Sequence, residues 1–271
     1  MDRVIDHGKK SVLGVRVDAL DYDAAAERIV RAASEGRGYA VSALAVHGVM
    51  TGVGDPEHLY RLNSFDLLTP DGQPVRWALN ALHETGLRDR VYGPTLTLRL
   101  CERAAADDIP VFFYGSRPEV LRALEENLVA RFPGLRIAGT EPSKFRTTTS
   151  EEQVEIANRI KASGARITFV GLGCPRQEVF AYEYRDLLSM PVIAVGAAFD
   201  YHSGAAKEPP MWVQRMGLQW LHRLVRDPRR LWRRYLVLNV AFVARLAAQR
   251  LRIWDPDATS GAPPSRPVLY G

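Results

Sequence analysis

The chain has 271 residues, of which 46% are hydrophobic and 25% charged, values that exclude a disordered protein. This length suits one large α/β domain or one domain with an appendage. The two cysteines, Cys101 and Cys174, match no metal spacing and are typical of a reduced protein. The first residues lack a signal-peptide core, and no run reaches the roughly 18 apolar residues of a membrane span. We therefore expect a cytoplasmic protein, soluble or peripheral on a membrane.

Positive charge is concentrated near the end of the chain. Between Arg215 and Arg252 there are ten arginines and one acid, a net charge of +9, whereas the remainder carries −4. Such a segment indicates an interaction surface or an anion site.

Strands and helices alternate along the first 200 residues, which predicts a Rossmann-like α/β fold with a parallel sheet and helices on both faces. Asp21 is a candidate N-cap. Asp21-Tyr22-Asp23 also has the Asp-x-Asp spacing of a metal site, but a helix start explains these acids more simply, and we predict no metal. The expected strands are 12–17, 39–44, 65–69, 111–114, 135–139, 167–170 and 192–195. The expected helices are 22–34, 45–50, 56–63, 73–84, 95–106, 119–131, 151–163 and 177–188.

The alternation stops after Asp200, which predicts three parts. Residues 1–202 form the α/β domain, and residues 203–254 form a basic helical appendage with a long helix over 228–252. Residues 255–271 are rich in Pro, Gly and Ser and are expected to be a disordered tail.

The segment 167–200 reads as strand, glycine turn, helix and strand. Gly171 and Gly173 would then lie beside Asp200 at the carboxyl edge of the sheet, where α/β proteins bind ligands and where helix N-termini suit anions. A plain tight turn is the alternative. A dinucleotide fingerprint needs Gly or Ala three residues after Gly173, and the residue there is Arg176, so a nicotinamide-dependent enzyme is the less favoured interpretation.

Several polar residues follow predicted strands. Asp71 could act as a general base, although its position alone favours a helix N-cap. Arg90 and Arg117 could bind a pyrophosphate or lie in solvent. Glu178 could simply stabilise a helix start, an explanation that suits Gln177 less well.

Arginines and aromatic residues alternate with leucines in the appendage. This pattern fits a helix on an anionic membrane surface. It also fits nucleic acid, but Asp71 and the glycine turn would then have no role, so we predict no nucleic acid partner.

Five segments together resemble the WecG/TagA/CpsF glycosyltransferases, over roughly residues 12–245. Any one segment is ordinary, whereas five in the same order are specific. They are Pro70-Asp71-Gly72, Arg90-x-x-Gly93, the segment 171–178, the segment 195–200, and the arginine-rich segment 217–235.

The resemblance implies an inverting, metal-independent and cofactor-free hexosyltransferase. It would move a sugar, N-acetylmannosamine by family default, from a UDP-sugar to a polyprenyl-diphosphate-linked sugar in teichoic-acid or exopolysaccharide synthesis. The enzyme would lie on the inner face of the cytoplasmic membrane, and a homo-oligomer is left open. Asp71 would be the base, and Arg223, Arg230 and Arg233 would stabilise the departing diphosphate. The implied substrate-binding residues are Ser42, Arg90, Gly93, Gly171, Gly173, Gln177, Glu178 and Asp200.

Four positions depart from the family pattern. Leu44 replaces an amide after the second strand, Thr95 replaces an acid, Glu208 precedes two prolines in place of an arginine motif, and Gln219 replaces a glutamate. These departures leave the donor sugar open, with glucose or a uronic acid as alternatives.

Overall fold

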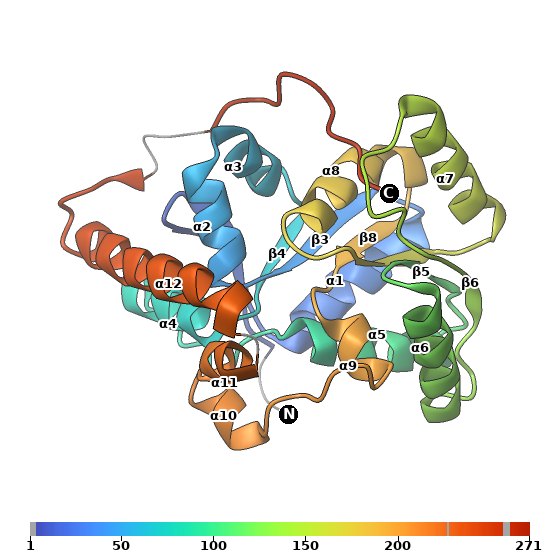
Figure 1. Cartoon of the computed structure of the whole chain (residues 1–271), viewed down its shortest axis with the longest axis horizontal. Helices are drawn as coiled ribbons and strands as arrows, with labels where there is room; N and C mark the ends of the chain where they lie inside the picture. The colour runs from blue at the N-terminus through green and yellow to red at the C-terminus, as the bar shows by residue number, and fades with distance from the viewer. Residues whose placement is uncertain (1–3, 227, 257–260) are drawn as a thin grey trace.

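The computed structural model describes residues 4–226, 228–256 and 261–271 (Figure 1). It confirms the α/β prediction: six parallel strands lie in the order β4-β3-β8-β7-β5-β6. Because all neighbouring pairs are parallel, the carboxyl ends of the strands lie at one edge of the sheet. The strands are β3 (Tyr39–Leu44), β4 (Leu67–Pro70), β5 (Val111–Gly115), β6 (Ile137–Glu141), β7 (Ile167–Gly171) and β8 (Pro191–Ala194).

Helices cover both faces of this sheet because its strands are apolar on both sides. One buried core joins the sheet to α1 (Tyr22–Glu35), α5 (Gly93–Ala106), α6 (Pro118–Arg131) and α9 (Ala198–His202). The second core joins it to α2 (Val46–Gly54), α3 (Pro56–Asn63), α4 (Gln73–His83), α7 (Ser150–Ala162) and α8 (Arg176–Leu188). Asp21 caps α1 as predicted, since its Oδ1 accepts the Ala24 N–H at 2.9 Å.

The first predicted strand, 12–17, is wrong. The chain instead forms an antiparallel hairpin of β1 (Asp6–Val12) and β2 (Val15–Leu20), which turns at Leu13 and Gly14, both with positive φ. The sequence of β1 is mostly polar because this strand lies largely at the surface, so it carries no apolar signal.

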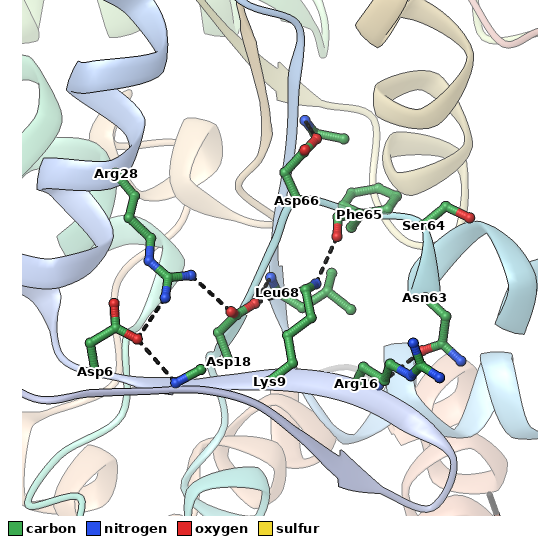
Figure 2. A network of polar contacts seen from close by, with 12 residues as sticks. Asp6, Lys9, Arg16, Asp18, Arg28, Asn63, Ser64, Phe65, Asp66 and Leu68 are labelled. Carbon is green, nitrogen blue, oxygen red and sulfur yellow. Dashed lines mark hydrogen bonds and ion pairs between the residues drawn. The ribbon is translucent and has the colours of Figure 1, made fainter.

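A polar network holds this hairpin against the edge strand β4 (Figure 2). The buried Asp18 accepts the Leu68 N–H at 2.9 Å and pairs with Arg28 at 3.0 Å. Lys9 lies 3.6 Å from the same carboxylate and donates to the Phe65 carbonyl oxygen at 2.7 Å. The hairpin thereby covers the outer edge of β4, the strand that leads to Asp71, and accepts a hydrogen bond from one of its N–H groups.

The appendage consists of α10 (Met211–Arg215), α11 (Gln219–Arg226) and α12 (Pro228–Arg250). In Figure 1, α12 runs beside α2 and α4, and its Phe242 is buried in the second core. Among the described helices, none is both long and apolar enough to cross a membrane.

The last residues differ from the disordered tail that their composition suggested. Residues 261–271 pass over α3 toward α7, with Ala262 N–H donating to the Pro56 carbonyl at 3.0 Å (Figure 1). Leu269 is buried, and its carbonyl accepts the Thr148 N–H at 3.0 Å. Prolines prevent a helix here but permit an extended strap, and one apolar residue anchors it.

Candidate functional site

A cavity of about 660 Å³ opens at the carboxyl edge of the sheet. Its walls come from the segments that follow β3, β4, β5, β7 and β8, and from the appendage. This is the edge at which the sequence placed the ligand. The appendage contributes Gly217, Gln219, Trp220, Leu238 and Asn239.

Asp71 lines this cavity directly after β4. The N-cap of α4 is Gly72, so the capping interpretation of Asp71 is wrong. Its Oδ1 instead accepts the N–H of Gly93 at 3.2 Å, and its own N–H donates to the Leu44 carbonyl at 3.2 Å. A Cβ at position 93 would lie 2.8 Å from the Val195 carbonyl oxygen, so only glycine brings this N–H to the carboxylate. The site therefore holds an oriented carboxylate.

Two buried polar residues, Gln177 and Glu178, line the cavity, and the buried Ser42 contacts Glu178. Glu178 Oε1 accepts hydrogen bonds from Ser42 Oγ at 3.0 Å and from Gln177 Nε2 at 2.9 Å. Gln177 Oε1 accepts the Gly196 N–H at 3.2 Å, which ties the start of α8 to the turn after β8. Burial raises the pKa of the Glu178 carboxyl, against the opposing effect of these hydrogen bonds. Gln177 and Glu178 are therefore cavity-lining residues that hydrogen bonds to Ser42 and to the turn after β8 hold in place.

Arg90 lies beside the cavity and is buried. Its guanidinium donates to Gln214 Oε1 at 3.0 Å and to Gln219 Oε1. It also stacks on the Tyr92 ring with 4.1 Å between the guanidinium carbon and the ring centroid. A cation thus reaches the cavity wall at the point where the α/β unit meets α10 and α11.

The remaining predicted residues divide into three groups. Gly171, Gly173 and Asp200 line the cavity, and Asp200 is exposed on α9. Arg117 also lines it but forms an exposed ion pair with Glu119 at 3.3 Å. The side chains of Arg223, Arg230 and Arg233 lie outside the described residues, so their role stays a prediction.

Sequence analysis missed several lining residues, because nothing in a linear pattern shows which helix face meets a cavity. They are His47, Tyr92, Phe145, Tyr201, Trp220 and Asn239. Asn239 alone carried a signal, as the one polar residue in an apolar run.

The model of the Glycosyl transferase WecG/TagA/CpsF family matches residues 10–256. The chain belongs to this family. The match covers the α/β unit, the cavity and the whole appendage, and it confirms the family resemblance of the five segments.

Two relatives in this family carry the name N-acetylglucosaminyldiphosphoundecaprenol N-acetyl-beta-D-mannosaminyltransferase. The chain is similar to that of Bacillus spizizenii, with 34% identity over 72% of this chain and 74% of the relative. It is also similar to that of Bacillus subtilis, with 30% identity over 67% and 69% of the two chains. A dinucleotide-dependent oxidoreductase is not favoured by these matches.

Proposed function

We propose that this glycosyltransferase moves an N-acetylmannosaminyl group from a UDP-sugar to a polyprenyl-diphosphate-linked N-acetylglucosamine, with inversion and without a metal. The observation that carries the proposal is the oriented Asp71 carboxylate in a cavity that the appendage closes. The names of the two Bacillus relatives support the acceptor and the sugar.

Asp71 would take the proton from the acceptor hydroxyl. The hydroxyl oxygen then attacks the anomeric carbon of the donor as the bond from that carbon to the UDP oxygen breaks. UDP leaves with the electron pair, and Arg90 together with arginines of the appendage would stabilise its charge. A single base and a cationic leaving-group site are sufficient for an inverting transfer.

The appendage would bring the enzyme to the lipid-linked acceptor. Several of its apolar side chains are exposed to an extent that is unusual for a surface in water: Met211 62%, Trp212 63%, Val225 74% and Val240 68%. Apolar residues that project among arginines favour binding at an anionic membrane surface. We therefore place the protein peripherally on the cytoplasmic face of the membrane.

The test measures UDP release from a panel of UDP-sugars with a polyprenyl-diphosphate-GlcNAc acceptor in EDTA. Release should depend on the acceptor, and D71N should lower the rate by about 10²- to 10⁴-fold, the usual contribution of a general base. E126Q, a substitution of an exposed acid on α6, serves as the control and should leave the rate unchanged. Full activity of D71N, or a requirement for metal, would contradict the corresponding part of the proposal.

A further inference from the structure

We infer that Asn239 of α12 is a substrate-contacting residue that binds the sugar of the acceptor, an inference that rests on the proposed function. Asn239 and Leu238 line the cavity from α12, while His47 lines it from α2, the helix against which α12 packs. Asp71 lines the same cavity.

The polarity of Asn239 is unusual for its surroundings. Every other residue from Leu236 to Ala244 is apolar. An amide among apolar groups costs free energy unless it forms hydrogen bonds. The side-chain amide of Asn239 is half-buried, and it makes no hydrogen bond to the groups that the structure describes, which exclude the side chains of residues 230, 231 and 233–235. Packing of α12 therefore does not explain this amide, whereas a ligand in the cavity would.

The position of Asn239 on α12 indicates which of the two substrates its side chain contacts. Phe242 faces the buried core at 2% exposure, whereas Leu236 and Val243 are exposed at 49% and 63%. These two exposed residues lie one helical turn from Asn239 on either side. Leu236 and Val243 form part of an exposed apolar stripe along α12. Asn239 lies between this stripe and the cavity. An acceptor whose lipid follows this stripe would place the sugar end beside the amide.

The chemistry of the side chain also fits a sugar better than a diphosphate. An amide offers both donors and an acceptor, which complement hydroxyl and acetamido groups. Diphosphate oxygens only accept hydrogen bonds and are served by guanidinium groups such as Arg90. We therefore assign Asn239 to the acceptor sugar and not to UDP.

The experiment compares wild type, N239A and N239D with a water-soluble, short-chain lipid-diphosphate-GlcNAc acceptor and with the same acceptor in anionic vesicles. N239A should raise the acceptor KM about ten-fold, as expected for one lost hydrogen bond. The donor KM, the melting temperature and vesicle binding should not change. N239D keeps the shape of the side chain but loses its donors, so it should also raise the acceptor KM.

The matched control is N158A, the same substitution at an exposed position of α7 that does not line the cavity. It should leave the acceptor KM and vesicle binding unchanged. An acceptor KM within two-fold of wild type in both Asn239 variants would overturn the inference, as would an increase confined to the donor KM. If wild type transfers no sugar to any lipid-linked acceptor, the proposed function fails first and the inference fails with it.

Discussion

The Arg90 guanidinium donates a hydrogen bond to Gln214 Oε1 over 3.0 Å, and this contact joins the α/β unit to the appendage. Gln219, its second partner, is also a neutral amide. The side chain therefore fixes the appendage without losing its charge, and one residue couples the position of the appendage to the electrostatics of the cavity.

R90K tests this coupling. A lysine keeps the charge, but it lacks the planar guanidinium that donates to both glutamines and stacks on Tyr92. We therefore expect kcat/KM for the UDP-sugar to fall about 10- to 100-fold. Proteolysis between residues 203 and 210 should become faster as the appendage loosens. The control is R99K, because Arg99 stacks on Tyr22 at 4.5 Å and pairs with Asp23 at 2.7 Å but does not line the cavity. Equal losses in the two variants would contradict a specific role for Arg90.

We expect the strap formed by residues 261–271 to hold one loop of the cavity rim in place. It hydrogen-bonds the loop 143–149, from which Phe145 lines the cavity, and Tyr270 stacks on Arg176 at 5.7 Å. L269D places a charge at a buried anchor, so the strap should detach. Chymotrypsin should then cleave at Phe145 faster, and the donor KM should rise several-fold, whereas R266D at an exposed position of the strap should change neither. Unchanged cleavage in L269D would show that the loop is held by its own contacts.

The sequence predicted most of the α/β unit because local signals and tertiary packing agree there. β3 and α3 have the predicted bounds: β3 is a buried apolar run, and α3 starts at a proline after the Asp55 cap. The hairpin strand β1 and the strap were missed because their order depends on distant partners. Phe65 binds Lys9 of β1, and Thr148 binds Leu269 of the strap.

The candidate site was likewise predicted only in part. The strand-end rule placed Asp71, Gly171 and Asp200 at one edge. It could not show that Gly93 orients Asp71, nor that Gln177 turns its amide toward Gly196, because these bonds depend on how separate loops pack.

The buried Glu178 gives a pH dependence with a defined sign. Its pKa is raised in the folded protein, chiefly by burial, so between the ordinary value of 4.5 and the folded value the native state binds more protons than the unfolded state. The free energy of unfolding should therefore fall as pH rises through this window, by up to about 1.4 kcal/mol per pH unit from this one group. E178Q keeps the shape without the titration, so its stability relative to wild type should increase with pH and then level off.

Urea unfolding of both proteins between pH 4.5 and pH 8 measures this difference. E126Q, which alters an exposed acid, should give a stability difference that does not grow with pH. A constant difference between E178Q and wild type would mean that Glu178 ionises as readily in the folded protein as in the unfolded chain. Glu178 would then accept the hydrogen bonds of Gln177 and Ser42 as a carboxylate and not as a neutral acid.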